Sequence, residues 1–327
     1  MPELPEVECL ARAVREETRD YEFVDVRFLR QDLREPMPFG AIRDALVGEV
    51  AGNVRRRSKY LLVETARGTA ILHLGMSGQL LSMDGPDPVK PHTHVIFELR
   101  RKDSSPFPRA SRSGKAQNDD VPRRHPEDDL PRRHPEIESR HPEPEAKGPL
   151  PSRKFLHFVD PRRFGRLTAV ASGADLRVHP WLRDLGPEPL EIPAAELAEH
   201  LFRLSRSRKT AVKPFIMDGG IVVGVGNIYA SESLFLAGIR PGRAAGRVTR
   251  AEYGVLASSI QKVLNAAINS GGTTLRDYLH ADGSEGSYAL RLNVYGRSSE
   301  PCRKCSTPIR EMRHANRSTY FCGTCQK

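Results

Sequence analysis

The sequence predicts an α+β protein with a β-rich first half behind a leading helix, and a helical second half ending in a cysteine-rich ribbon. Three observations predict this class. Short apolar segments separated by turns recur through the first half, helical periodicity replaces them after residue 194, and four of the five cysteines lie near the C-terminus. With 327 residues the chain is long enough for two domains that each bury a core.

The first half is predicted to be a helix followed by strands. Leu4, Val7, Ala11 and Val14 repeat at helical spacing, and the prolines and glutamates around them suit a first helical turn. Several short strands separated by turns indicate a sandwich or a barrel. The predicted strands are residues 23–28, 60–64, 70–74, 95–99, 155–159 and 166–171.

Residues 101–153 interrupt this pattern. The segment is rich in Pro, Arg, His, Asp and Glu, and it contains a degenerate repeat of the type Pro-Arg-Arg-His-Pro-Glu. Such a composition cannot bury enough apolar surface to fold. Its histidines could bind a metal and its arginines could contact phosphate, but we expect a solvated, disordered insertion loop that extends a hairpin.

The second half is predicted to be helical. Residues 194–204 have helical periodicity, and residues 249–269 form a long helix that starts with a Thr249–Glu252 capping box and ends at Gly271-Gly272. A Gly-Pro-Glu-Pro stretch before these helices indicates a domain boundary. The expected domains are residues 1–186, 187–292 and a terminal ribbon at 293–327.

The four C-terminal cysteines follow the spacing of a zinc ribbon, with two Cys-x2-Cys pairs separated by sixteen residues. Two disulfides are the alternative, which a reducing cytoplasm disfavours. Because all four ligands would come from the protein, the single zinc ion is expected to be structural. The ligands are Cys302, Cys305, Cys322 and Cys325. Cys9, on the leading helix, is expected to be a small buried apolar residue.

Charge and hydropathy restrict the partners and the compartment. A net charge of +10 and a pI of about 9.5 favour a polyanionic partner. No apolar run approaches the roughly 20 residues that span a bilayer, and the acidic N-terminus is unlike a signal peptide. We therefore expect a cytoplasmic protein with no membrane partner.

The N-terminus itself suggests chemistry. Removal of Met1 would leave Pro2 with a secondary amine, and an α-amino group of pKa about 8 is partly unprotonated at neutral pH. Such an amine can attack a sugar carbon and form an iminium ion, while Glu3 and Glu6 transfer protons. The same residues also suit the start of a helix, and the two interpretations are compatible.

Ordered blocks of sequence resemble the formamidopyrimidine-DNA glycosylase family. The resemblance covers nearly the whole chain apart from the insertion loop, and the motif Met-Pro-Glu-Leu-Pro-Glu-Val-Glu at the N-terminus is joined by the C-terminal ribbon. The other matching blocks are residues 58–62, 73–78, 160–165, 185–190, 209–214, 224–232, 271–275 and 294–297.

The resemblance implies a bifunctional DNA glycosylase and abasic-site lyase of base excision repair. The family excises oxidised purines, such as 8-oxoguanine and formamidopyrimidines, from double-stranded DNA and then cuts the strand by β- and δ-elimination. By similarity, Pro2 attacks C1′, Glu3 is the general acid and base, and Glu6 lies near the reacting sugar. Lys59 and Arg317 resemble the proton donors of β- and δ-elimination. A monomer associated with a bacterial nucleoid would suffice.

The resemblance also implies how DNA is held. An N-terminal β-sandwich with flanking helices would face a helix–two-turn–helix whose turn, residues 224–227, presents backbone N–H groups to a phosphate. Because a base must be flipped out before excision, side chains must fill the void. Met76, Arg162 and Phe164 match the void-filling residues, and His92, Lys209, Asn227 and Tyr295 lie at DNA-contacting positions. Residues 280–288 correspond to a loop that closes over the flipped base.

Two other functions fit parts of the sequence. Endonuclease VIII-like glycosylases share the proline and the ribbon but act on oxidised pyrimidines; Leu4 and the base-closing loop favour the purine group. A non-catalytic zinc protein that binds lesions would need wedge and phosphate contacts but no amine. The joint presence of Pro2, Glu3, Lys59 and Arg317 disfavours it.

Overall fold

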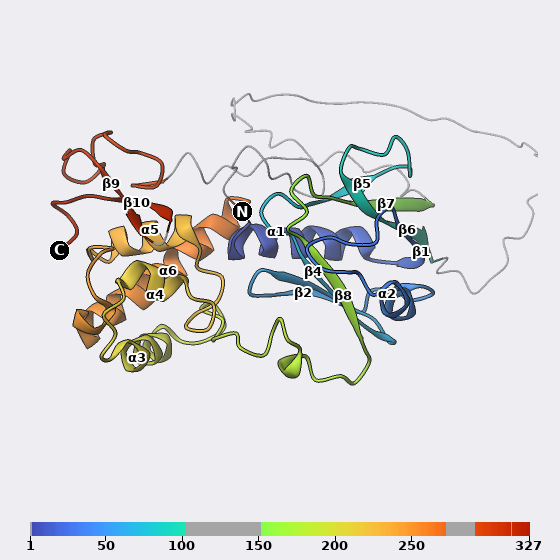
Figure 1. Cartoon of the computed structure of the whole chain (residues 1–327), viewed down its shortest axis with the longest axis horizontal. Coiled ribbons are helices and arrows are strands. Elements are labelled where there is room, and N and C mark those ends of the chain that lie inside the picture. The colour runs from blue at the N-terminus through green and yellow to red at the C-terminus, as the bar shows by residue number, and fades with distance from the viewer. Residues whose placement is uncertain (1, 103–151, 273–291, 315) are drawn as a thin grey trace, which may run out of the picture. The chain divides into compact units, whose positions relative to one another are not determined.

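The computed structural model describes residues 2–102, 152–272, 292–314 and 316–327 (Figure 1). Most of the predicted insertion loop and the predicted base-closing loop at 280–288 lie outside these ranges. The elements of the first half are α1 (Leu4–Thr18), β1 (Tyr21–Phe28), α2 (Phe39–Leu46), β2 (Asn53–Arg57), β3 (Tyr60–Glu64), β4 (Gly68–His73), β5 (Gln79–Met83), β6 (Thr93–Arg101), β7 (Arg153–Val159) and β8 (Arg166–Ala171).

The strands of the first half form two four-stranded antiparallel sheets, in the orders β1-β6-β7-β5 and β2-β3-β4-β8. Leu72 and Leu167 from one sheet and Phe97 and Phe158 from the other belong to one cluster of buried apolar side chains. Two sheets with their apolar faces on a shared core are a β-sandwich, so the predicted class is confirmed and the barrel is not formed.

Helix α1 contributes to two cores. Val7 and Leu10 pack in the core of the sandwich, whereas Leu4 belongs to the core of the helical half. The backbone N–H of Leu4 donates to the carbonyl of Gly224, 3.2 Å away, which joins the first turn of α1 to the other half. Cys9 is half-buried against this second core, and burial raises the pKa of its thiol to about 11.

The helical half contains α3 (Ala194–Ser205), α4 (Val212–Met217), α5 (Asn227–Leu236) and α6 (Arg250–Asn269). The predicted capping box at the start of α6 is present: the Thr249 N–H donates to Glu252 Oε2 at 2.8 Å, and the Glu252 N–H donates to Thr249 Oγ1 at 3.3 Å. Gly271 and Gly272 follow α6 with φ of 74° and 88°, a conformation that favours glycine, so the predicted end is also confirmed.

The chain ends in a two-stranded hairpin of β9 (Arg310–His314) and β10 (Arg317–Phe321). Cys302, Cys322 and Ile309 pack with Phe235 from α5 and with Val294. This small core attaches the cysteine-rich ribbon to the helical half.

The sequence located all six of its predicted strands and missed others. Strands β2 and β5 and helix α2 were not predicted. Strands β6 and β7 pair directly, with Arg100 opposite Arg153, so the insertion does leave and re-enter a hairpin as expected. The boundaries proposed for the domains remain a prediction. Among the described helices none is both long and apolar enough to cross a membrane.

Candidate active site and nucleic-acid interface

The carboxylate of Glu3 lies at the N-terminus of α5. It is buried and accepts hydrogen bonds from the backbone N–H groups of Ile228 (3.2 Å) and Tyr229 (3.4 Å). The N–H groups of a first helical turn have no partner within the helix, so a carboxylate is stabilised there. Gly226 makes the approach possible, since a Cβ at that position would lie 2.1 Å from the carboxyl carbon of Glu3.

Burial raises the pKa of Glu3 above its ordinary value of 4.5. Lys59 opposes this shift, the negative charge of Glu6 adds to it, and the two hydrogen bonds from α5 oppose it again. A carboxyl group with a raised pKa keeps its proton to higher pH than an ordinary carboxyl group, which suits a general acid.

Contacts of Glu3 and Glu6 fix the position of the neighbouring Pro2. It is buried and directly precedes Glu3, which is the N-cap residue of α1. The backbone N–H of Glu3 donates to Glu6 Oε2 at 2.8 Å, and the hydroxyl of Tyr229 donates to Glu6 Oε1. Two predicted catalytic residues, Glu3 and Glu6, therefore connect the N-terminus of α1 to the first turn of α5.

Lys59 is placed at the tip of the β2–β3 hairpin. Ser58 and Lys59 form the turn, with Arg57 paired to Tyr60 across it. Burial lowers the pKa of Lys59 below its ordinary value of 10.5; Glu3 opposes the shift and Arg317 adds to it. The electrostatic coupling with both residues indicates that the hairpin delivers this lysine to the region of Glu3.

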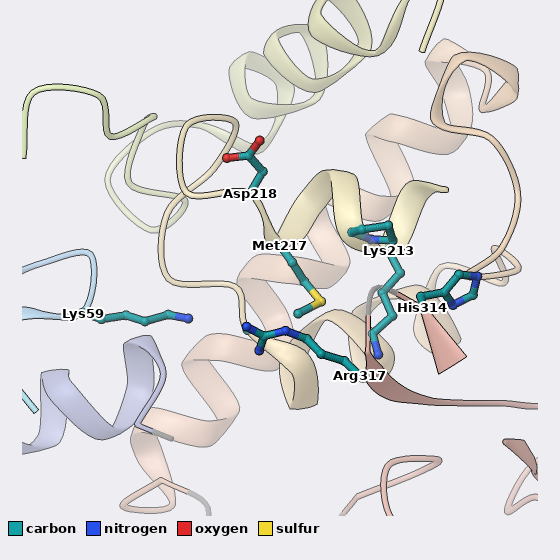
Figure 2. A pocket seen from close by; sticks show the side chains of 8 residues that line it. Lys59, Lys213, Met217, Asp218, His314 and Arg317 are labelled. Atoms are coloured by element: carbon teal, nitrogen blue, oxygen red, sulfur yellow. The ribbon is translucent and has the colours of Figure 1, made fainter. Parts of the chain in front are cut away.

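Lys59 and Arg317 line one pocket of about 220 Å³ together with Gly226. Figure 2 shows the two side chains extending toward one another from opposite sides of the pocket. The other lining residues are Lys213, Pro214, Met217, Asp218 and His314. Because lysine, arginine and histidine dominate the polar lining, the pocket suits an anionic ligand such as a phosphate ester.

Lys213 is a site residue that the sequence did not single out. Its ammonium is buried and donates to Asn227 Oδ1 (2.6 Å), to the carbonyl of Ser318 (3.0 Å) and to Thr319 Oγ1 (2.9 Å). Burial lowers its pKa to about 8. A lysine in the otherwise apolar stretch 211–217 is the signal that could have revealed it, because an uncompensated charge is costly to bury.

Met76, Arg162 and Phe164, the predicted void-filling residues, are brought together with Arg317 around a second pocket of about 540 Å³. Met76 and Phe164 are both 39% exposed and line the same pocket, and the guanidinium of Arg162 lies 5.0 Å from the ring centroid of Phe164. Exposed apolar side chains beside an arginine suit insertion into a base stack. Leu33, Arg34, His73, Gly75 and Arg163 complete the lining.

A buried carboxylate, Asp160, joins the loop that follows Met76 to the loop that contains Arg162 and Phe164. It accepts hydrogen bonds from Ser77 Oγ (2.8 Å) and from the backbone N–H of Gly165 (2.7 Å).

His73 is a second lining residue that the sequence did not single out. Burial lowers its pKa to about 4, and its Nδ1 accepts a hydrogen bond from the backbone N–H of Gly75. His73 is therefore neutral at pH 7.

The remaining predicted DNA contacts divide into two groups. Asn227 starts α5 and its amide nitrogen donates to the Tyr295 hydroxyl, 3.4 Å away, so these two lie together beside the first pocket. Tyr295 is held by the buried Glu232, which accepts its backbone N–H at 3.0 Å. His92 and Lys209 are exposed, and neither lines either pocket.

The ribbon brings its four cysteine sulfurs within 4.8 Å of one another. The closest pairs are 3.5 and 4.0 Å apart, far beyond the roughly 2.05 Å of a disulfide bond. A tetrahedral zinc ion with sulfurs at about 2.3 Å requires sulfur–sulfur separations of about 3.8 Å. The geometry fits one structural zinc ion, and the backbone N–H groups of Lys304 and Cys325 donate to the sulfurs.

Three family models match the chain in order. They are the formamidopyrimidine-DNA glycosylase N-terminal domain at residues 1–115, the formamidopyrimidine-DNA glycosylase H2TH domain at 185–278 and the zinc finger found in FPG and IleRS at 299–327. The chain is 40% identical to the formamidopyrimidine-DNA glycosylase of Thioalkalivibrio sulfidiphilus and 42% identical to that of Alkalilimnicola ehrlichii, in both cases over the full length of the two chains.

Solved structures show the same similarity. The MutM (FPG) protein of Thermus thermophilus is 32% identical with a TM-score of 0.73, covering 99% of this chain and 98% of that one. A MutM structure in complex with DNA containing carbocyclic 8-oxo-G is 25% identical with a TM-score of 0.73, covering all of both chains.

Proposed function

This chain belongs to the formamidopyrimidine-DNA glycosylase family, and from that premise we propose that it excises oxidised purines from DNA and cleaves the resulting abasic site. The observation that carries the proposal is the buried carboxylate of Glu3 on the first turn of α5. It is coupled electrostatically to Lys59, and Lys59 shares a pocket with Arg317. Base excision repair is the corresponding process.

The base-excision step uses the N-terminal amine. After removal of Met1, the nitrogen of Pro2 attacks C1′ of the flipped nucleotide and displaces the base. The C1′–O4′ bond then breaks as O4′ takes a proton, and the C1′–N bond becomes an iminium link between enzyme and sugar. Glu3 acts as the general acid and base of this step. Its raised pKa supports the role, because burial favours the protonated carboxyl group, which can give its proton to a leaving group.

The strand-cleavage steps use the cations of the first pocket. Lys59 donates a proton in β-elimination and Arg317 in δ-elimination, leaving a one-nucleotide gap with phosphate ends. The lowered pKa of Lys59 makes it a better donor at neutral pH than an exposed lysine. Asn227, with Lys213 behind it, and the N–H groups near Gly226 would hold a phosphate of the same strand.

The second pocket supplies what base flipping requires. A glycosidic carbon inside a duplex is inaccessible, so the nucleotide must leave the stack and the predicted void-filling residues must take its place. The zinc ion holds the ribbon that presents Arg317. All of these groups belong to one chain, so a monomer is sufficient for the reaction. We place this monomer in the cytoplasm of a bacterium, at the nucleoid.

The relatives named above distinguish the purine group from the alternatives. They are formamidopyrimidine-DNA glycosylases and not endonuclease VIII-like enzymes. A lesion-binding protein without catalysis would have no use for a buried carboxylate coupled to a lysine beside its N-terminus.

Borohydride trapping on a duplex with one 8-oxoguanine opposite cytosine tests the proposal. We expect a covalent adduct that maps by mass spectrometry to Pro2, in a chain that has lost Met1, and no adduct with undamaged DNA. Glu3→Gln should lose the adduct on 8-oxoguanine but keep it on a preformed abasic site. Release of thymine glycol without release of 8-oxoguanine would support the sister specificity, and binding without any adduct would refute catalysis.

A further inference from the structure

The turn that carries Lys59 has an unfavourable backbone conformation. Ser58, the first of its two turn residues, has a φ of 57°. This left-handed region is unfavourable for a residue with a side chain, and glycine is preferred in such turns. The chain must therefore obtain from elsewhere the contacts that keep the turn, and with it Lys59, in one place.

Glu188 and Arg57 supply these contacts. The backbone N–H of Ser58 donates to Glu188 Oε1 at 2.6 Å, and Arg57 Nη1 lies 2.9 Å from the same oxygen. The other terminal nitrogen of Arg57 donates to the carbonyls of Leu185 (3.1 Å) and Gly186 (2.7 Å). We call these interactions the Arg57–Glu188 clamp; they bind the hairpin to the segment that leads into the helical half.

Through Arg56, the same carboxylate also connects to α1, the helix that follows Pro2 and Glu3. Arg56 Nη1 donates to Glu188 Oε2 at 2.6 Å and to the carbonyl of Ser58 at 3.0 Å, and Arg56 Nε lies 3.2 Å from Glu8 on α1. Arg56 and Glu188 side chains are each only 4% exposed. One buried ionic network thus joins the hairpin of Lys59, the helix of Pro2 and Glu3, and residues 185–188.

We propose that Arg57 and Glu188 are positioning residues for strand cleavage, because the Arg57–Glu188 clamp fixes Lys59 relative to Pro2 and Glu3. The proposal rests on the proposed function. Neither residue lines the pocket, so both act through Lys59. Base excision should depend on the clamp much less, since Glu3 is held by α5 through contacts that do not involve the hairpin.

Arg57→Met is the appropriate perturbation. Removing Glu188 would leave two guanidinium groups without their buried partner and could unfold the chain, whereas the Arg57 side chain is 25% exposed. Arg55→Met is the matched control. Arg55 lies two residues away on the same face of β2 and pairs with Glu64 inside the hairpin at 2.5 Å.

The measurement compares two events on a preformed abasic duplex under single turnover. Borohydride trapping reports attack by Pro2, and strand cleavage reports elimination. For Arg57→Met we expect trapping within about 3-fold of wild type but cleavage slowed about 10- to 100-fold, the range that a displacement near 1 Å can produce. Arg57→Lys, which restores a charge beside Glu188 but not both carbonyl contacts, should recover part of the rate. Arg55→Met should match wild type.

The pH profile provides a readout that general loss of structure would not move. The charged and titratable groups facing Lys59 are Glu3, which caps α1, Glu6 of α1, Arg317 of β10 and His73 of β4. Once released toward solvent, Lys59 should regain its ordinary pKa, so the alkaline limb of cleavage in Arg57→Met should move to higher pH.

Three results have distinct meanings. Equal cleavage in Arg57→Met and Arg55→Met would overturn the inference, and so would a parallel loss of trapping and cleavage, which would show that the clamp serves folding alone. Absence of trapping by the wild-type chain, on either lesion or abasic DNA, would instead refute the proposed function. Lys59→Ala, assayed beside them, sets the cleavage rate expected when the lysine is absent.

Discussion

Replacing Gly226 by alanine is expected to slow base excision about 100-fold while the chain stays folded. The backbone of Gly226, with φ of −98° and ψ of −160°, is extended and accepts an L residue. The added methyl group would lie 2.1 Å from the carboxyl carbon of Glu3 and 2.3 and 2.5 Å from its oxygens. Real Cβ atoms do not approach other atoms within 3.0 Å, so the carboxylate must retreat by about 1 Å.

A displacement of that size moves Glu3 out of hydrogen-bonding range of α5. Its contacts with the Ile228 and Tyr229 N–H groups are already 3.2 and 3.4 Å long, so retreat breaks them. Misplacing a catalytic group by 1 Å can cost about 100-fold in rate, which corresponds to about 2.7 kcal/mol of transition-state stabilisation.

Single-turnover release of 8-oxoguanine is the assay for Gly226→Ala. Gly254→Ala, on α6 with no atom within 4 Å of the added methyl, is the matched control and should keep the wild-type rate with a slightly higher melting temperature. Thermal melting of Gly226→Ala separates lost chemistry from unfolding. A folded Gly226→Ala chain that excises within about 3-fold of wild type would refute the reasoning that Glu3 must contact the first turn of α5.

Three further outcomes are expected. Burial raises the pKa of Glu3, so the folded state is destabilised relative to the unfolded chain as pH rises above 4.5. Glu3→Gln should therefore melt higher than wild type near pH 8, with the difference vanishing below 4.5, and an unchanged melting temperature at pH 8 would contradict this. Met76→Ala should slow 8-oxoguanine release about 10-fold but strand cleavage at a preformed abasic site by less than about 3-fold, since unstacking a base costs a few kcal/mol; equal losses would argue against a wedge. Cys305→Ser should lower the metal content below one zinc ion per chain and weaken DNA binding at least about 10-fold, because Arg317 lies on the hairpin of the zinc ribbon. Metal analysis and a DNA-binding titration would test the two effects, and tight DNA binding without zinc would contradict the prediction.

Local patterns predicted those elements whose stabilising contacts lie within the element. The Thr249–Glu252 capping box fixed the start of α6 because both partners are three residues apart. The strands at residues 60–64 and 166–171 were predicted to the residue, because each contains apolar side chains that pack in the core, such as Leu61 and Leu167. The four cysteines were likewise predicted as zinc ligands from the sequence, because their two Cys-x2-Cys spacings are typical of a tetrahedral zinc site.

Other elements depend on partners far along the chain. Strand β2, Asn53–Arg57, carries three consecutive arginines and has no strand signal of its own. Its charges are compensated by Glu8, Glu64 and Glu188, which only the fold brings to it. Lys213 was missed for the same reason, because its acceptors Ser318 and Thr319 lie more than a hundred residues away.

The sequence by itself determined the fold class, the order of most of the elements, the zinc ligands and the types of group available for catalysis. The tertiary structure decided what those groups can do. A carboxylate three residues from the N-terminus is ordinary in solution, and its pKa is raised only because α1 and α5 bury it beside Gly226. The shift in the pKa of Lys59 likewise arises from burial and from neighbours on other elements. Reactivity of this kind comes from desolvation and through-space charge, which no local pattern of residues encodes.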